Sequence, residues 1–401
     1  MKSKRCISIA MFFLSIFVLA GGVVTSQAED LIVDLGRGPI TVTVPTGYEP
    51  GSPMPLVLVL HGYGGSHVYI EEWWGMADRA EEYGFFVAHP DGTIDNNGAR
   101  FWNATDACCN FFGSTVDDSQ YLLDLIDEIK SLVDVDDRRV YVTGHSNGGF
   151  MSYRMACDHP ETVAAIGSMA GATWADPLDC NPASSVHALQ IHGTADGVIS
   201  YNGGNIGGNI YPSAVESVEY WAGVAGCSLL PDTSAPPVDL ESSIPGAETT
   251  ITRYADDCGA DGSGELWTLT GAGHSPNFNE LFSQMLVEYL LAHPKSDVAA
   301  ETDVSVDPIS NLFSCAPNPF SSTTSIRLQL DTPEEVSVRV LTASGRRIRN
   351  LIGSRTFPAG DHTILWDGQS DGGDRMAAGA YFIHVQLGNE HHNTRVVQFA
   401  H

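Results

Sequence analysis

The segment that most constrains the fold is residues 140–151, which passes from an apolar run through closely spaced glycines into a helical pattern. Residues 140–142 are apolar and mainly β-branched, as in a buried strand. Gly144, Ser146 and Gly148 then form a Gly-x-Ser-x-Gly motif, and residues 150–156 have helical spacing. A strand, a tight turn and a helix in this order predict a nucleophile elbow, with the helix N-terminus directed at Ser146. The alternative is a glycine-rich turn that merely exposes a serine.

A second glycine-rich loop follows the apolar run at residues 55–60, which is typical of a central strand covered on both faces. Its sequence is His61-Gly62-Tyr63-Gly64-Gly65. Glycines let the backbone approach a substrate carbonyl, so we expect the backbone N–H groups of Tyr63 and Asn147 to form an oxyanion hole. The alternative is a glycine-rich strand end that binds nothing.

Two later strand ends supply an acid and a base. The strand at 188–192 leads into a loop with Asp196, and the strand at 266–270 leads into a glycine-rich loop with His274. The chain order Ser146, Asp196, His274 is that of a triad in an α/β-hydrolase. The alternative for Asp196 is an Asx-turn. His61 and His192 also precede glycines at strand ends, and we interpret them as structural.

The loops beside these strand ends suggest a substrate-binding surface. Residues 99–112 form a long aperiodic segment that contains Trp102, and such loops commonly wall a site. Residues 201–210 are rich in Gly and Asn, and we expect a mobile loop beside Asp196. We expect Trp102, His145 and Tyr201 to contact the substrate.

The periodic patterns predict an α/β fold with a mainly parallel central sheet. Alternation over 31–43 predicts an edge hairpin, and further buried strands are expected at 85–88 and 164–171. Helices are expected at 73–83, 117–132, 214–223 and 279–292. We interpret Asp117 and Asp118 as caps of their helix rather than as catalytic residues, because acidic groups are favoured at helix N-termini.

The last quarter of the chain has a different character. Residues 295–311 lose hydrophobicity and collect Asp, Ser, Glu and Pro, which indicates a linker. Short alternating runs follow at 325–330, 335–341, 362–366, 380–387 and 394–399, which predict a small β-sandwich over 312–401. This part has no clustered catalytic side chains, so attachment or targeting is its expected role.

The N-terminus predicts export. Lys2, Lys4 and Arg5 precede an apolar run at 7–24, and Ser26-Gln27-Ala28 resembles a cleavage site. We therefore expect residues 1–28 to be a signal peptide, the hydrolase-like domain to span 29–294, and the mature protein to be secreted. An uncleaved membrane anchor is the alternative. No later stretch is long and apolar enough to span a bilayer.

The eight cysteines are consistent with an oxidising compartment. Sequence alone does not fix their pairing. We expect a bridge between Cys227 and Cys258, separate partners for the adjacent Cys108 and Cys109, with Cys157 and Cys180 as candidates, and Cys315 left over. No CxxC pairs or histidines lie at zinc spacing, so we predict no metal site.

The net charge of −29 is concentrated in the first domain. Residues 29–303 contain 9 Lys+Arg and 40 Asp+Glu, whereas residues 304–401 contain 8 and 9. Such an acidic surface argues against nucleic acid or an anionic membrane as a partner. Its simplest interpretation is solubility outside the cell.

Residues 30–293 resemble the secreted polyhydroxybutyrate depolymerase and feruloyl esterase group of carbohydrate esterase family 1. The resemblance rests on the loop at 61–65, Trp102-Asn103 with Cys108-Cys109, Asp117-Asp118, and the motifs at 144–149, 192–196 and 273–274. It implies Ser146 as nucleophile, His274 as base, Asp196 as acid, and no cofactor. The family often has Trp-Pro after its catalytic Gly-His, where this chain has Ser275-Pro276, so the resemblance does not extend to the shape of the acyl or aromatic subsite.

The C-terminal region resembles the Ig-like modules of secreted bacterial enzymes, which include type IX sorting domains and the flagellar hook-capping module. The matching residues are 317–320, Gly345-Arg346, 366–368 and 379–382. The resemblance implies contact with secretion machinery or attachment to the cell surface. Residues 396–401 lack the basic end that many sorting signals carry.

These patterns together predict a secreted serine carboxylic-ester hydrolase. The expected substrate is a polyester such as polyhydroxybutyrate, in soluble or insoluble form, or a feruloyl or acetyl ester of a polysaccharide. The alternatives are a serine peptidase on the same fold and a non-catalytic polymer-binding protein.

Overall fold

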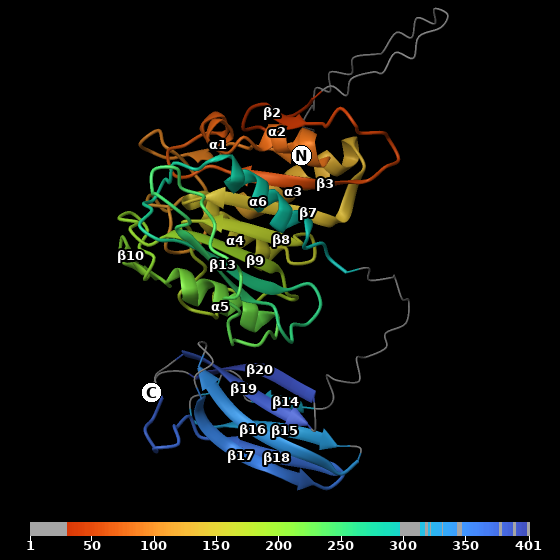
Figure 1. Cartoon of the computed structure of the whole chain (residues 1–401), viewed down its shortest axis with the longest axis vertical. Helices are drawn as coiled ribbons and strands as arrows, with labels where there is room; N and C mark the ends of the chain where they lie inside the picture. The colour runs from red at the N-terminus through yellow and green to blue at the C-terminus, as the bar shows by residue number, and fades with distance from the viewer. Residues whose placement is uncertain are drawn as a thin grey trace, which may run out of the picture.

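The computed structural model describes residues 30–296 and the segments 313–316, 320, 322–330, 332–342, 347–376, 379–387 and 390–398 (Figure 1). The expected signal peptide at 1–28 and most of the expected linker at 295–311 lie outside the described residues. No helix within the described ranges has the length and apolar character needed to cross a membrane.

The first domain is built on a nine-stranded sheet whose central strands are parallel. In spatial order it contains β1 (Leu31–Val33), β2 (Ile40–Thr43), β4 (Phe86–Ala88), β3 (Met54–Leu60), β7 (Val135–His145), β8 (Ala165–Met169), β9 (His187–Gly193), β13 (Ser263–Leu269) and β12 (Thr249–Tyr254). The strands β1, β2 and β12 pair antiparallel at the two edges. Because β3, β7, β9 and β13 run the same way, the loops that follow them meet at one edge of the sheet.

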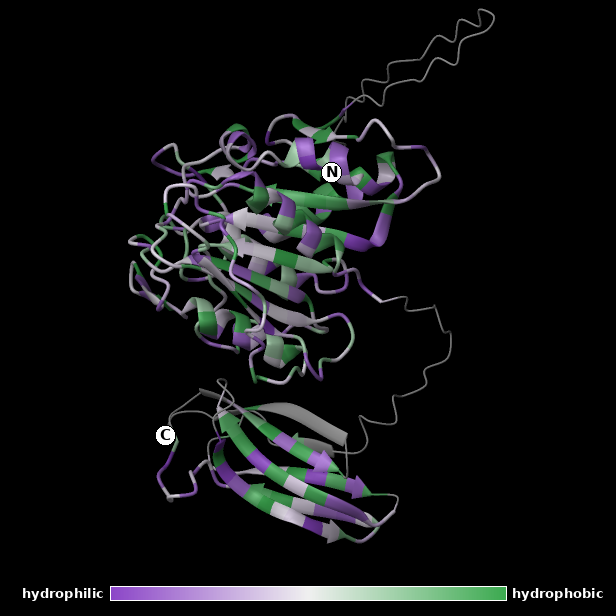
Figure 2. Cartoon of the chain, in the orientation of Figure 1, coloured by the Kyte–Doolittle hydropathy of each residue, from purple (hydrophilic) through white to green (hydrophobic). Residues whose placement is uncertain are grey.

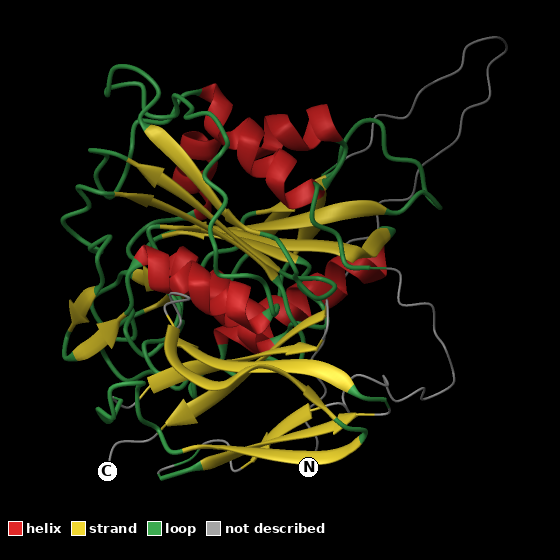
Figure 3. Ribbon diagram, turned by 60° about the horizontal axis from the view of Figure 1, so that its bottom comes forward, coloured by secondary structure: helices red, strands yellow, loops and turns green. Residues whose placement is uncertain are grey.

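Helices cover both faces of this sheet, as Figure 3 shows. Alternate side chains of a strand face opposite sides, so Leu56 and Leu58 pack with α3 (Asp118–Leu132) and α4 (Asn147–Asp158). Val57 and Val59 pack on the other face with α6 (Glu280–Leu291). The apolar colouring of β3 in Figure 2 reflects this burial on both sides. The predicted α/β fold with a mainly parallel sheet is confirmed.

The helix predicted at 73–83 is two helices, so that prediction was wrong in its extent. They are α1 (His67–Trp74) and α2 (Met76–Tyr83). Gly75 separates them with a φ of 63°, a left-handed conformation that glycine adopts without strain. Its N–H donates to the carbonyl of Glu71 and closes α1. The helical spacing continues through this break, and the pattern alone therefore concealed it. The remaining helix, α5 (Ala214–Val224), begins at a capping box made by Ser213 and Glu216.

The segment expected to be a mobile loop at 201–210 instead contains a hairpin. Strands β10 (Gly204–Ile206) and β11 (Asn209–Tyr211) pair antiparallel across a turn at Gly207 and Gly208, both of which have positive φ. The amide of Asn209 donates to the carbonyl of Asp106 at 2.6 Å, which ties the hairpin to the segment that precedes the cysteine pair. A second short hairpin, β5 (Thr93–Ile94) with β6 (Arg100–Phe101), lies earlier in the chain.

The cysteine pairing differs from expectation at one place. Cys227 pairs with Cys258 as predicted. Cys108 and Cys109 pair with each other rather than with separate partners, and Cys157 pairs with Cys180. Pairing depends on proximity in the fold, which the linear order of cysteines does not encode. Cys315 is unpaired among the described residues, and burial raises the pKa of its thiol to about 12.

The C-terminal region is an antiparallel β-structure, as predicted. One sheet has the order β14-β15-β18 and the other β17-β16-β19-β20. The strands are β14 (Phe313–Ala316), β15 (Thr324–Leu330), β16 (Glu334–Thr342), β17 (Arg347–Phe357), β18 (Gly360–Trp366), β19 (Gly379–Leu387) and β20 (Glu390–Gln398). A buried cluster that includes Ile326, Val338 and Trp366 joins the sheets. The sequence did not predict β14 or β17, and β17 has an irregular burial pattern.

Candidate active site

Ser146 lies in the sharp turn between β7 and α4. Its φ is 54°, which is unusual for a residue with a side chain, and its N–H donates to the carbonyl of Met169 at 2.7 Å. The flanking glycines are required because backbones cross closely here. A Cβ on Gly144 would lie 2.6 Å from the carbonyl of Gly148, and one on Gly148 would lie 2.2 Å from the Leu60 oxygen. The glycines of the motif are therefore required by steric crowding in the turn that carries Ser146.

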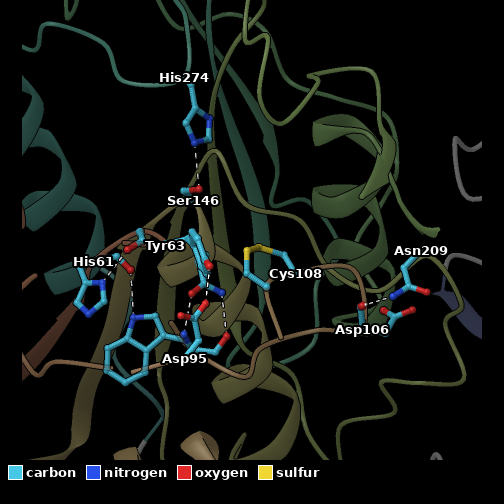
Figure 4. The surroundings of a disulfide bond; sticks show 12 residues. His61, Tyr63, Asp95, Asp106, Cys108, Ser146, Asn209 and His274 are labelled. Atoms are coloured by element: carbon cyan, nitrogen blue, oxygen red, sulfur yellow. Dashed lines mark hydrogen bonds between the residues drawn. A yellow bond between two sulfur atoms is a disulfide. The ribbon is translucent and has the colours of Figure 1, made fainter. Parts of the chain in front are cut away.

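The structure brings together the three side chains that the sequence grouped as a triad. The Nε2 atom of His274 is 3.0 Å from the Ser146 Oγ, and its Nδ1 atom is 2.7 Å from the Asp196 Oδ2. Figure 4 shows the His274 ring directly above the Ser146 hydroxyl. The loops after β9 and β13 supply Asp196 and His274. These distances are suited to proton transfer from the serine to the imidazole.

Asp196 is held as a carboxylate by hydrogen bonds to both of its oxygens. Its Oδ1 accepts from the backbone N–H groups of Val198 at 2.8 Å and Ile199 at 2.9 Å. Its Oδ2 faces the rings of His274 and His192. Burial alone would raise the pKa of Asp196, but hydrogen bonds from His192 and His274 outweigh it and hold that pKa well below its usual range.

The glycine-rich loop after β3 lies against the elbow. A Cβ on Gly62 would be 3.3 Å from the Ser146 Cβ, so the loop that continues into Tyr63 passes directly beside the serine. Buried His61 anchors this loop, since its Nε2 accepts from the N–H of Gly92 at 3.0 Å. Tyr63 and Asn147 thus flank Ser146, and their role as oxyanion donors remains a prediction.

Trp102 was expected to contact substrate, and that prediction was wrong, because its side chain is fully buried. Its indole N–H donates to the carbonyl of His61 at 3.0 Å. Its backbone makes a reciprocal pair with the side chain of Asn147, with N–H to Oδ1 at 2.7 Å and Nδ2–H to carbonyl at 2.9 Å. Trp102 therefore joins the two segments expected to form the oxyanion hole. Nothing in the sequence indicated this interior position, because the surrounding loop has no periodicity.

His145 is buried to about the same degree as Ser146, with 6% and 8% of the two residues exposed, and its contact with substrate stays a prediction. Its Nε2 lies 2.9 Å from the carbonyl oxygen of His274, which can only accept, so the Nε2 carries the proton. Its ring centroid is 4.8 Å from those of Trp73 and His274. Trp73 in turn donates to the carbonyl of Pro276 at 3.1 Å. These contacts hold the loop that carries His274.

Tyr201 lies behind the acid. Its ring meets His192 edge-on at 5.8 Å, and its hydroxyl is 3.0 Å from the Thr268 Oγ1. It is half-buried, and its contact with substrate stays a prediction.

An exposed aromatic surface adjoins the elbow. The ring of Tyr63 packs edge-on against Phe111 at 5.2 Å, and its hydroxyl donates to Asp95 at 2.5 Å. Phe112 is also exposed. Phe111 and Phe112 follow the Cys108–Cys109 disulfide, which Figure 4 shows beside Ser146 and Tyr63. Exposed aromatic side chains of this kind commonly mark a ligand surface.

Asp118 has a structural role that its interpretation as a cap missed. Asp117 caps α3 by accepting from the N–H of Gln120 at 3.1 Å. The neighbouring Asp118 carboxylate is fully buried, pairs with Arg37 at 2.5 Å and accepts from the N–H of Asn103 at 2.6 Å. Asp118 therefore anchors the long loop beside the elbow. The acidic pair was a usable signal, whereas Arg37 in a glycine-rich turn gave none.

Within the described ranges, no group of three or more His, Cys, Asp or Glu side chains is placed to hold a metal ion.

The buried histidines predict that the folded protein loses stability in acid. Burial, reinforced by His274, lowers the pKa of His145 to about 3, and burial with His293 brings that of His187 to about 3. In the unfolded chain both take up protons near a pH of about 6.5. The unfolded state therefore binds more protons between these values, and stability falls as the pH drops through this window. Calorimetry should show Tm decreasing across it, with a shallower decrease in a His145→Gln, His187→Gln variant. An unchanged slope would contradict the prediction.

Comparison with known proteins agrees with this geometry. Residues 55–224 match the family described as alpha/beta hydrolase fold, and residues 316–390 match the FlgD Ig-like domain. These matches agree with the α/β-hydrolase fold and the C-terminal Ig-like domain that the resemblance implied.

Several curated proteins and solved structures that resemble this chain are named as esterases. Feruloyl esterase B of Piromyces equi is 28% identical over 244 residues, which covers 59% of this chain and 42% of the relative. Feruloyl esterase C of Emericella nidulans is 29% identical over 168 residues, covering 40% of this chain and 56% of the relative. Among solved structures, acetyl xylan esterase from Aspergillus awamori has 18% identity and a TM-score of 0.42, covering 66% of this chain and 99% of that chain. This chain spans less than two thirds of the length of the curated relatives that it matches.

Proposed function

We propose that this protein is a serine carboxylic-ester hydrolase. The observation that carries the proposal is the continuous contact from the Ser146 Oγ through His274 to Asp196, with distances of 3.0 Å and 2.7 Å. Such a contact gives the serine a base, and the base an orienting anion. The names of the curated relatives support an ester as the substrate.

The reaction proceeds through an acyl-enzyme. Ser146 Oγ attacks the ester carbonyl carbon while its proton passes to His274 Nε2. Backbone N–H groups of Tyr63 and Asn147, with the N-terminus of α4, stabilise the oxyanion. The intermediate collapses, and the alcohol leaves with the proton from His274. Water then gives a proton to His274 and attacks the acyl carbon, which releases the carboxylic acid and returns the proton to Ser146.

The proposed substrate is an uncharged or weakly charged ester of a larger molecule, either a feruloyl or acetyl ester of a polysaccharide or a polyhydroxybutyrate-like polyester. The exposed rings of Tyr63 and Phe111 suit an aromatic or aliphatic chain beside the serine. The excess of acidic over basic residues in positions 29–303 disfavours polyanions.

Export and attachment complete the proposal. Three disulfides within the described residues suit an oxidising, extracellular location. The C-terminal Ig-like domain is proposed to bind polymer, secretion machinery or the cell surface. Pull-down with the full chain and with a chain ending at residue 304 would show which of these contacts depends on it.

A substrate panel tests the activity. Purified protein is expected to hydrolyse p-nitrophenyl acetate, methyl ferulate and at least one polymeric ester, and to leave peptide p-nitroanilides intact. Release of acetate, ferulate or hydroxybutyrate is measured directly. Faster cleavage of peptides than of esters would favour a serine peptidase, and no cleavage with no labelling by a fluorophosphonate would favour a binding protein.

A further inference from the structure

A chain of buried polar side chains runs from α4 to the candidate acid. Tyr153 on α4 and Gln190 and His192 on β9 are each almost fully buried. The Tyr153 hydroxyl donates to the Gln190 Oε1 at 2.8 Å. Gln190 and His192 are two residues apart on a strand, so their side chains share a face and meet, with 3.0 Å between Gln190 Nε2 and His192 Nδ1.

The hydrogen-bond partners of Gln190 and His192 show which of their nitrogen atoms carry protons. The Gln190 Nε2 also lies 2.9 Å from the carbonyl of Gly171, which can only accept, so this atom is the NH₂ group. The His192 Nε2 lies 2.9 Å from the carbonyl of Ile199, so the Nε2 carries a proton. Its Nδ1 is then free to accept from Gln190. These two contacts together specify the tautomer of His192 that has its proton on Nε2.

The same ring nitrogen, whose proton points to the Ile199 carbonyl, also lies beside the candidate triad. The His192 Nε2 is 3.3 Å from the Asp196 Oδ2, the same oxygen that faces His274 Nδ1 at 2.7 Å. The other carboxylate oxygen accepts from two backbone N–H groups. All sides of the carboxylate are therefore constrained, and the contact from His192 is the part that depends on a side chain outside the triad.

We propose that His192 is a positioning residue for ester hydrolysis: its Nε2–H, oriented by Gln190, fixes the Asp196 oxygen that orients His274. The inference rests on the proposed function. Ionisable neighbours of the ring are Asp196 and Tyr201, with His274 and His145 beyond Asp196. Because His192 makes no contact with the serine, it acts through Asp196 and not on the substrate.

Two conservative substitutions separate positioning from simple packing. The amide nitrogen of a glutamine reaches the place of a histidine Nε2, whereas that of an asparagine reaches only the place of Nδ1. His192→Asn is therefore expected to lower kcat for p-nitrophenyl acetate by about 10-fold with little change in KM, because small misplacements of a catalytic group have effects of at least this size. His192→Gln is expected to recover most of that loss. Equal losses in both variants, or a lowered Tm with kcat unchanged, would overturn the proposal.

A substitution at Gln190 tests the proposal through the charge of His192 rather than through the length of its side chain. Gln190→Glu replaces the donor to His192 Nδ1 with an acceptor and favours a doubly protonated His192 beside Asp196. That cation competes with the imidazolium that forms on His274, so the acid limb of the kcat/KM profile should move to lower pH. Tyr153→Phe is the matched control. It removes the buried hydrogen bond from Tyr153 to the Gln190 Oε1 and leaves the Gln190 NH₂ in place. The two profiles coinciding would count against the proposal.

One measurement is independent of turnover. Ring-nitrogen NMR of the wild-type protein at neutral pH should show His192 protonated on Nε2 alone. A proton on Nδ1 would refute the inference whether or not the protein hydrolyses esters. Absence of ester turnover with the expected His192 signal would refute the proposed function and leave the hydrogen-bond chain standing as structure only.

Discussion

Ser146→Ala is expected to lower kcat for p-nitrophenyl acetate by about a millionfold, because a serine hydrolase without its nucleophile loses nearly all of the advantage of its triad. The fold should persist. Alanine has the same Cβ as serine, so the turn at φ 54° meets no new steric cost. The side-chain hydroxyl makes its hydrogen bond to His274, and the structural N–H bond to Met169 is a backbone contact that the substitution retains.

The measurement should pair activity with labelling and stability. A fluorophosphonate probe is expected to label the wild-type protein and not the variant, while the Tm of the two stays within a few degrees. Ser131→Ala is a suitable control, because this serine is exposed in the last turn of α3, where its hydroxyl donates to the carbonyl of Glu128. Retention of full activity by Ser146→Ala would refute the assignment of the nucleophile.

Asp196→Asn is expected to lower kcat by about 10⁴-fold, the size seen when the acid of a serine triad becomes an amide. The hydrogen bonds of this structure give the reason. The Oδ1 accepts from Val198 and Ile199, so an asparagine would keep its oxygen there and turn its NH₂ toward His274. His274 would then accept at Nδ1 and carry its proton on Nε2. An imidazole in that tautomer has no lone pair for the proton of Ser146.

A matched loss of charge isolates this effect. Asp137→Asn removes a carboxylate whose side chain is 83% exposed and which pairs with Lys130. It should leave kcat unchanged, since exposed ion pairs contribute little. If Asp196→Asn were as active as Asp137→Asn, Asp196 could not be the residue that orients His274.

The central sheet shows which parts of the fold can be predicted from local sequence patterns. The continuous apolar run at 55–60 and the apolar run before Ser146 predicted strands that the structure contains, because burial on both faces of a strand favours an unbroken run of apolar residues. Gly75 and the Gly207–Gly208 turn show the limit. Each changes the chain direction at one or two positions, within segments whose wider composition suggested a helix or a loop.

The candidate site also contains residues that local sequence predicted and residues whose positions it did not. Ser146, Asp196 and His274 could be singled out because each follows a strand in a loop with a recognisable composition. Trp102 was also singled out, but as a substrate contact, and the structure buries its side chain completely. Nothing in the linear sequence distinguishes an aromatic residue that faces a ligand from one that braces a loop. Gln190 carried a usable signal, since an amide in an otherwise apolar strand needs buried partners.

The sequence by itself determined the elbow, the order of the strand-end loops, the division into an acidic α/β domain and a β-rich region, and the three side chains grouped as a triad. These properties are written in short segments, where periodicity and glycine spacing reflect local sterics and burial. Only the tertiary structure decided that Cys108 pairs with Cys109, that Trp102 joins two loops, and that the His192 ring lies against the Asp196 carboxylate. Those contacts depend on distances between segments far apart in the chain, and such distances are set by the packing of the whole sheet and its helices.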